Sequence, residues 1–172
     1  MLVDSHCHLD FPDFDGEHDA LIARAAEAGV TRMVTICTRL RNAPQVRTIA
    51  ETHGPVFWAA GTHPMSVADE PMATVDELVK LAGHPKFVGI GETGLDYHYT
   101  AESAGLQQDS LRIHIEAARR TGLPLSSETS ATTMAMPAEG PSLGVAPEGK
   151  CRCTSSDSRV SSARPMACRW VR

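Results

Sequence analysis

The chain has 172 residues and a formal net charge of −5. This length suits one domain with a buried core and is short for two. An acidic chain without a Lys/Arg cluster is not expected to hold duplex nucleic acid through many phosphate contacts, unless bound metal supplies the positive charge. We find no apolar run that could span a bilayer and no signal peptide, so we expect a cytoplasmic protein without membrane contact.

The first 125 residues alternate short apolar strands with helical patterns. The predicted strands cover residues 2–6, 31–38, 56–61 and 87–91, and the predicted helices cover residues 17–28, 42–52, 74–82 and 102–121. Such units in series imply parallel strands joined by helical crossovers. We therefore predict an α/β fold, a partial (β/α)8 TIM barrel of about four β/α units. A doubly wound open sheet is the alternative, but the Gly-rich phosphate loop that usually follows its first strand is absent.

The first predicted strand carries a metal-binding pattern. Its sequence runs into Asp4-Ser5-His6-Cys7-His8. Successive side chains of a strand alternate faces, so Asp4, His6 and His8 should point the same way, and two imidazoles can then reach one metal ion. A packed histidine is the alternative for either ring alone. Two histidines at i and i+2 beside a carboxylate favour the metal site.

A second pattern follows the fourth predicted strand, in the segment Gly91-Glu92-Thr93-Gly94-Leu95-Asp96-Tyr97. Glycines beside a carboxylate allow close approach of backbone and ligand, and the two oxygens of Glu92 can bridge two cations. A Gly-rich turn with a solvated glutamate is the alternative. The two histidines, His63 and Glu92 all fall near the carboxyl ends of different strands, where a TIM barrel assembles its active site.

The chain changes character after Leu125. All eight histidines, all four phenylalanines, both tyrosines and every isoleucine precede that point. A segment so poor in apolar residues cannot offset its ordering entropy, so we expect residues 126–172 to be a largely disordered tail behind a domain of residues 1–125. The pattern stops inside a β/α unit, at the first residue of a fifth strand. We interpret the break as a frameshift or rearrangement in the gene, which the nucleotide sequence would test.

These motifs together resemble the TatD family of metal-dependent hydrolases. The resemblance rests on residues 4–10, on Gly61-Thr62-His63-Pro64, on residues 91–97, and on Gln107-Gln108 followed by a helix that ends at Gly122-Leu123-Pro124. It covers residues 1 to about 125. The family implies hydrolysis of phosphodiesters, with Mg²⁺-dependent DNase activity on single strands, through two divalent ions per intact site, for which Mn²⁺ or Zn²⁺ are alternatives to Mg²⁺.

The resemblance also implies roles for single residues. His6 and His8 would hold one metal, and Glu92 would bridge it to a second and act in catalysis. His63 and Asp96 would bind substrate. Asp4 would orient a ligand histidine without itself binding the metal, or would line the cleft. We expect surface or helix-capping positions for His18, His53, His84 and His114, whereas His98, in the loop after Glu92, could face the cleft.

The departures from the family are as informative as the matches. The family supplies a histidine after strand five, another after strand six and an aspartate near strand eight, and residues 126–172 provide no counterpart in this interpretation. No histidine follows His114. We therefore expect weak metal binding, little or no hydrolysis, and open edges at the first and fourth strands. Two alternatives remain: a non-catalytic remnant with half a metal site, and an amidohydrolase, which usually bridges its metals with a modified lysine instead of a glutamate.

Overall fold

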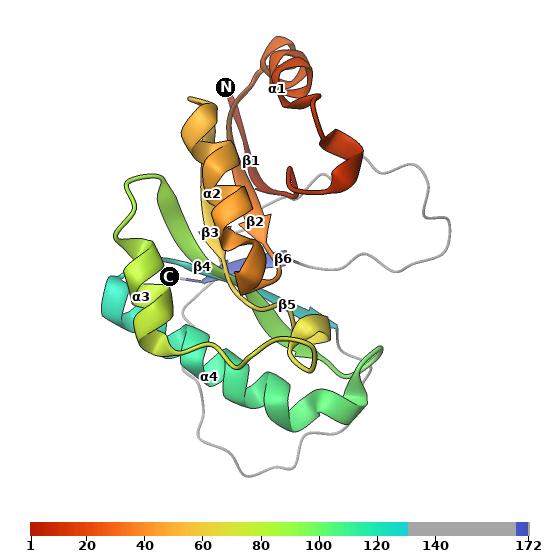
Figure 1. Ribbon diagram of the computed structural model, residues 1–172, viewed down its shortest axis with the longest axis vertical. Helices are drawn as coiled ribbons and strands as arrows, with labels where there is room; N and C mark the ends of the chain where they lie inside the picture. Colours follow the sequence, from red (N-terminus) through yellow and green to blue (C-terminus); the bar gives the residue numbers. More distant parts are fainter. Residues whose placement is uncertain (131–167, 172) are drawn as a thin grey trace.

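A computed structural model describes residues 1–130 and 168–171, and Figure 1 shows their arrangement. The strands are β1 (Leu2–Cys7), β2 (Val30–Cys37), β3 (Val56–Ala60), β4 (Phe87–Asp96), β5 (Leu125–Ser130) and β6 (Cys168–Val171). The α-helices are α1 (His18–Glu27), α2 (Ala43–Thr52), α3 (Val75–Ala82) and α4 (Ala104–Thr121). Short 3-10 turns η1 (Pro12–Phe14), η2 (Leu40–Asn42), η3 (Pro64–Ser66) and η4 (Ala101–Ser103) complete the order.

The strands form one sheet in chain order, from β1 to β6. The first five run parallel, each joined to the next by a helical crossover, and β6 pairs antiparallel with β5. The predicted α/β fold is confirmed, with a fifth parallel strand present beyond the four predicted units. Within the described residues β1 pairs with β2 alone, so its outer edge is open as expected. The expected open edge at the fourth strand is wrong, because β5 covers it.

The apolar core lies between the sheet and its helices. In Figure 1 α2 lies over β2 and β3, and α3 and α4 lie against β4, in agreement with their residue contacts. Trp58 is completely buried in β3, where its ring meets that of Phe87 edge to face at 4.7 Å. Val46 of α2 and Leu78 of α3 are completely buried in the same cluster. The strand that carries His63 at its end is therefore held by large apolar contacts.

The fourth strand is longer than predicted. β4 continues five residues past Gly91, because Thr93 to Asp96 pair with Ser127 to Ser130 of β5. Gly91 and Gly94 have φ values of +124° and +146°, and a Cβ on either would collide with a carbonyl oxygen of β5. These two glycines permit the close approach of the two strands.

The chain keeps its strand pattern past residue 125. β5 extends to Ser130, so its part beyond Leu125 is ordered where the start of a disordered tail was expected. Parallel pairing with β4 accounts for the difference, because the ladder supplies hydrogen bonds that the apolar content of the segment does not reveal. The remainder of the predicted tail, residues 131–167 and residue 172, lies outside the described residues.

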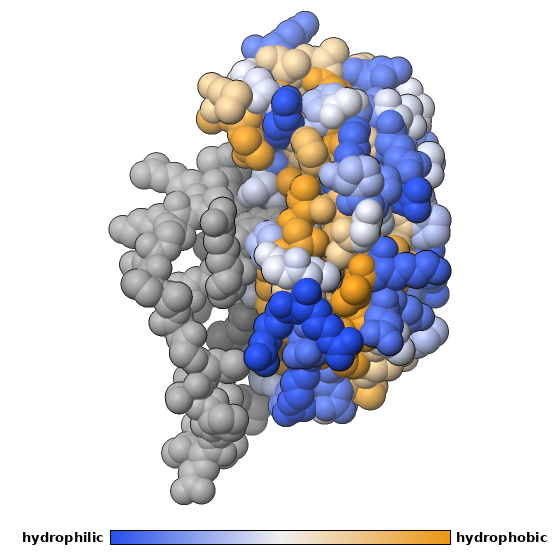
Figure 2. Space-filling view, turned by 90° about the vertical axis from the view of Figure 1, so that its left-hand side faces the viewer, coloured by the Kyte–Doolittle hydropathy of each residue, from blue (hydrophilic) through white to orange (hydrophobic). Residues whose placement is uncertain are grey.

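Helix ends follow their local sequence. Thr74 and Glu77 form a reciprocal capping box at the start of α3. Gly122 has a φ of +69° and its N–H bonds to the carbonyl of Ala118, which ends α4. No helix within residues 1–130 is both long and apolar enough to cross a membrane. Figure 2 shows a face on which apolar patches in orange are interrupted by hydrophilic side chains in blue.

Candidate metal centre

Two histidines and one glutamate converge at the carboxyl end of the sheet. His6 comes from β1, His8 follows that strand, and Glu92 lies in β4. The Nε2 atoms of the two rings are 3.3 Å apart. Glu92 places Oε1 3.5 Å from the Nε2 of His6 and Oε2 3.8 Å from the Nε2 of His8. The three predicted metal ligands are thus within reach of one ion.

The donor set fits a divalent cation. Ligand atoms 2.0–2.1 Å from a tetrahedral ion are about 3.3–3.4 Å apart, close to the separation of the two imidazole nitrogens. The Nδ1 of His8 lies 3.0 Å from the carbonyl oxygen of Ile36. A carbonyl can only accept, so Nδ1 of His8 carries the proton and its Nε2 presents a lone pair to the site. Two imidazoles and a carboxylate suit Zn²⁺ or Mn²⁺ as well as Mg²⁺.

Glu92 is buried, with 2% of its surface exposed. Burial opposes its ionisation, but the hydrogen bond from His6 and the charges of His6, His63 and His8 lower the pKa of its carboxyl below the usual value. A buried carboxylate that these contacts keep ionised is a suitable ligand for a cation, because a bound cation would balance its charge.

A second group shares Glu92 and adds a residue that the sequence interpretation missed. His63, Glu92 and Glu128 have donor atoms within 4.8 Å of one another. The Nε2 of His63 lies 2.7 Å from Oε2 of Glu128. Glu128 belongs to β5, in register with Gly94 of β4. Glu128, a residue after Leu125 that the sequence interpretation did not include, therefore lies beside His63. Strand periodicity from Leu125 was the available signal, and the polar composition obscured it.

The proton on Nε2 of His63 makes the second group chemically different from the first. The backbone N–H of Met65 donates to Nδ1 of His63 over 3.2 Å, so the other nitrogen, Nε2, carries the proton that Glu128 accepts. Burial disfavours the charged ring, yet the hydrogen bond to Glu128 and the negative charges of Glu92, Glu128 and Asp96 raise the pKa of His63. This imidazole is a hydrogen-bond donor, which suits a phosphate oxygen better than a metal.

Helix α4 holds the loops that carry His63 and Asp96. Gln107 is completely buried, and its side-chain oxygen accepts from the backbone N–H of Asp96 while its nitrogen donates to the carbonyl of Asp96. His114 is also completely buried, and its Nε2 accepts from the backbone N–H of Thr62 at 3.0 Å. The surface or capping position predicted for His114 is wrong, because its ring lies under the loop that leads to His63.

The predicted supporting residue lies beside the ligand strand. Oδ1 of Asp4 accepts from the backbone N–H of His6 at 3.0 Å. Asp96, the other predicted substrate residue, is buried and its Oδ1 accepts from the backbone N–H groups of His98 and Tyr99. Asp4 thus contacts the backbone of a ligand, and Asp96 orders the loop after β4.

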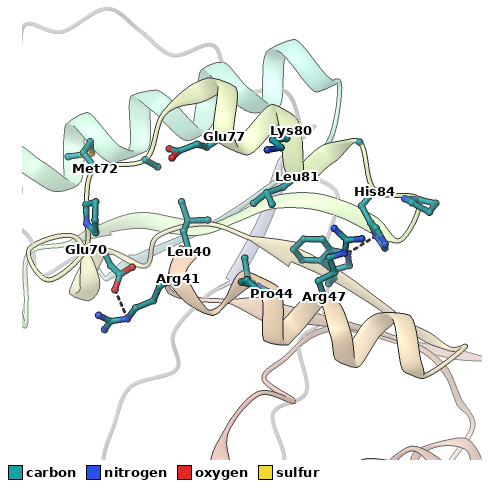
Figure 3. A pocket seen from close by; sticks show the side chains of 16 residues that line it. Leu40, Arg41, Pro44, Arg47, Glu70, Met72, Glu77, Lys80, Leu81 and His84 are labelled. Atoms are coloured by element: carbon teal, nitrogen blue, oxygen red, sulfur yellow. Dashed lines mark hydrogen bonds and ion pairs between the residues drawn. The ribbon is translucent and has the colours of Figure 1, made fainter.

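A separate cavity of about 770 Å³ lies between α2 and α3, away from both groups. Figure 3 shows Leu40 and Leu81 inside it, with Arg41 paired to Glu70 at one end. None of the six predicted site residues lines it. Both groups of possible metal ligands therefore lie at the carboxyl end of the sheet and not in this cavity.

Known proteins share both the sequence and the half-barrel. The family model described as TatD related DNase matches residues 3–134. A metal-dependent hydrolase of uncharacterised function from Escherichia coli K12, YcfH, is 36% identical over 132 residues, covering 75% of this chain and 49% of that protein. TatD of Mycobacterium tuberculosis, also an uncharacterised metal-dependent hydrolase, is 37% identical over 134 residues, covering 72% of this chain and 50% of that protein.

A third relative has a named activity, the 3′-5′ ssDNA/RNA exonuclease TatD of Enterobacter lignolyticus, at 30% identity over 72% of this chain and 48% of that protein. The crystal structure of the TatD homologue YJJV from E. coli K12 superimposes with a TM-score of 0.66 at 32% identity, over 72% of this chain and 49% of that one. The chain spans about half the length of the curated relatives it matches, and its sheet is a curled half of their barrel. The chain belongs to the TatD family of metal-dependent hydrolases.

Proposed function

We propose that this chain binds a divalent cation through His6, His8 and Glu92 and acts on phosphodiesters, with less activity than full-length relatives. The convergence of these three side chains carries the proposal. Glu92 belongs to both groups of ligand atoms, so its carboxylate would take part in holding either of two cations. The second cation would rest on Glu92 and Glu128, because the protonated Nε2 of His63 is unavailable to it.

The other proposed roles belong to His63 and Asp96. The Nε2–H group of His63 donates a hydrogen bond to a phosphate oxygen, which replaces Glu128 as the acceptor. Asp96 fixes the loop at the mouth of the site through the N–H groups of His98 and Tyr99. When bound, the cations would supply an activated water and would neutralise the developing negative charge. Single-stranded DNA is the proposed substrate, because one relative is named for action on ssDNA and RNA.

Reduced activity follows from the ligand count. Among the residues that the structure describes, the first group offers three protein donors and the second offers two carboxylates once His63 is excluded. A cation with few protein ligands binds weakly and leaves its water poorly oriented. The non-catalytic remnant is the second candidate, and it differs only in turnover.

Calorimetric titration of the full chain with Mn²⁺ tests cation binding. We expect His6→Ala to lower the affinity at least tenfold, and His53→Ala to leave it unchanged, since His53 lies in neither group. Equal affinity of the wild type and His6→Ala for Mn²⁺ would refute the site. Hydrolysis of a labelled oligothymidylate by the Mn²⁺-loaded chain, lost in His6→Ala, then distinguishes a slow enzyme from a remnant.

A further inference from the structure

Three exposed apolar side chains lie at the carboxyl end of the sheet. Phe11, Met65 and Tyr99 are 44%, 43% and 55% exposed and follow β1, β3 and β4 respectively. Exposed apolar side chains are unremarkable one at a time. These three come shortly after His8, His63 and Asp96 in the chain, so they lie at the same end of the sheet as the predicted site residues. We call Phe11, Met65 and Tyr99 the apolar rim.

Each member of the apolar rim is joined directly to a different site residue. The ring of Phe11 stacks on His8, with centroids 5.1 Å apart and planes inclined by 7°. The backbone N–H of Met65 donates to His63. The backbone N–H of Tyr99 donates to Asp96. These contacts place the ring of Phe11 and the backbones of Met65 and Tyr99 directly beside predicted site residues.

The charge of the chain limits what such a rim can bind. Proteins that hold single strands usually combine a positive groove with aromatic rings on which bases stack. This chain has a formal charge of −5, so a positive groove contributes little. Rings beside a cation site remain as the source of affinity. Stacking requires that the base faces be accessible, which excludes paired bases.

We propose that the apolar rim is a stacking subsite for the unpaired nucleobases that flank a phosphate bound at the metal centre. Phe11 offers the free face of a ring whose other face rests on His8. Tyr99 offers a second ring, and Met65 offers a polarizable thioether for contact with a base edge. The subsite selects phosphodiesters that carry bases over those that carry none. It rests on the proposed function only for the position of the phosphate.

The test compares two fluorescein-labelled ten-mers, oligothymidylate and the same backbone with abasic tetrahydrofuran residues. Their dissociation constants for the full chain are measured with Mn²⁺ and again with EDTA. Charge is equal in the two probes, so the ratio of constants reports stacking alone. We expect the wild type to prefer the base-bearing strand by roughly 5- to 150-fold for one stacked base.

Variants then assign the preference. Phe11→Ala and Tyr99→Ala should each lower the ratio at least threefold, while Phe11→Trp should retain it because the ring remains. Leu2→Ala is the matched control, since Leu2 is 59% exposed at the opposite end of β1. A ratio near one in the wild type, no binding of the base-bearing strand, or an unchanged ratio in both alanine variants would overturn the subsite.

The two proposals fail in different ways. If Mn²⁺ does not bind but the ratio persists in EDTA, the stacking subsite stands and the metal function is refuted. If Mn²⁺ binds through His6 and the ratio is one, the metal function stands and the stacking subsite is refuted. Calorimetry with Mn²⁺ on Phe11→Ala shows whether the loss of the ring has also disturbed His8.

Discussion

The two sides of the metal centre share Glu92 and differ in where their protons lie. On the β1 side, the carbonyl of Ile36 holds the proton of His8 away from the site, so a lone pair faces the centre. On the β3 side, Met65 occupies Nδ1 of His63, so a proton faces the centre. One backbone contact per ring thus makes His8 suited to bind a cation and His63 suited to donate a hydrogen bond to an anion, although both are histidines beside carboxylates.

The supports of the two sides also differ. On the β1 side the neighbouring strand β2 supplies them: the hydroxyl of Thr35 accepts from the N–H of Leu9, and Ile36 holds His8. On the other side helix α4 supplies them through Gln107 and His114. On the β1 side a neighbouring strand makes these contacts, one through a side-chain hydroxyl and one through a backbone carbonyl, whereas on the other side a helix reaches under a loop with single side chains. The second side therefore depends more on individual residues.

Loss of the shared carboxylate should have the largest effect. Glu92→Gln removes the charge common to both sides, and we expect Mn²⁺ affinity to fall on the order of 1,000-fold, about 4 kcal/mol. This exceeds the roughly 10- to 100-fold that loss of a mere supporting contact costs. Calorimetry measures the affinity, and Glu77→Gln, at the cap of α3, controls for loss of a carboxylate. A decrease of less than tenfold would show that Glu92 is not shared.

Acid should weaken the α4 side through His114. Burial lowers the pKa of His114 to about 4, against 6.5 for a free imidazole. The unfolded chain binds this proton first as pH falls, so the contribution is complete above pH 6.5 and is lost as pH falls toward 4. It amounts to about 3 kcal/mol.

His114→Gln should flatten the decline in unfolding free energy between pH 6.5 and 4, as measured by urea denaturation. His53→Gln controls for the removal of an imidazole and should retain the wild-type slope. A slope in His114→Gln equal to that of the wild type would place the acid sensitivity elsewhere.

Loss of Gln107, the other supporting residue of α4, should lower the unfolding free energy by somewhat less. Gln107→Leu leaves the backbone N–H and carbonyl of Asp96 without their buried partner, and we expect a loss of about 2 kcal/mol in unfolding free energy. Gln108→Leu is the matched control, because Gln108 makes an exposed hydrogen bond to Tyr97 and should lose less than about 1 kcal/mol. Equal losses in the two variants would mean that α4 does not anchor the Asp96 loop.

The smallest effect should come from Glu128. Glu128→Gln removes the charge that raises the pKa of His63, so that pKa should fall, as followed by NMR of the imidazole protons. Mn²⁺ affinity at the group of His6, His8 and Glu92 should change by less than about threefold, because the β1 side is intact. A large loss of affinity would instead show that the first cation binds on the β3 side, beside Glu128.

The β1 side was predictable from sequence and the β3 side only in part. The spacing of His6 and His8 follows directly from strand alternation, and Glu92 from its Gly-rich strand end. Composition placed the end of the fold at Leu125, whereas pairing with β4 extends it and brings Glu128 to His63. The burial of His114 depends on how α4 packs under a distant loop, a tertiary contact that helical position alone does not reveal. The proposed frameshift and the disorder of residues 131–167 stay predictions.

Three glycines across neighbouring strands determine how this centre can be re-engineered. A Cβ on Gly61 would stand 2.6 Å from the Cα of Gly91, and one on Gly91 or Gly94 would strike β5. The spacing of the backbone segments that carry His63, Glu92 and Glu128 is therefore set by direct backbone contact at glycines, which have no side chain that could be shortened. Exchanging the side chains at positions 63, 92 and 128 can change the chemistry, but moving these positions apart would require moving whole strands.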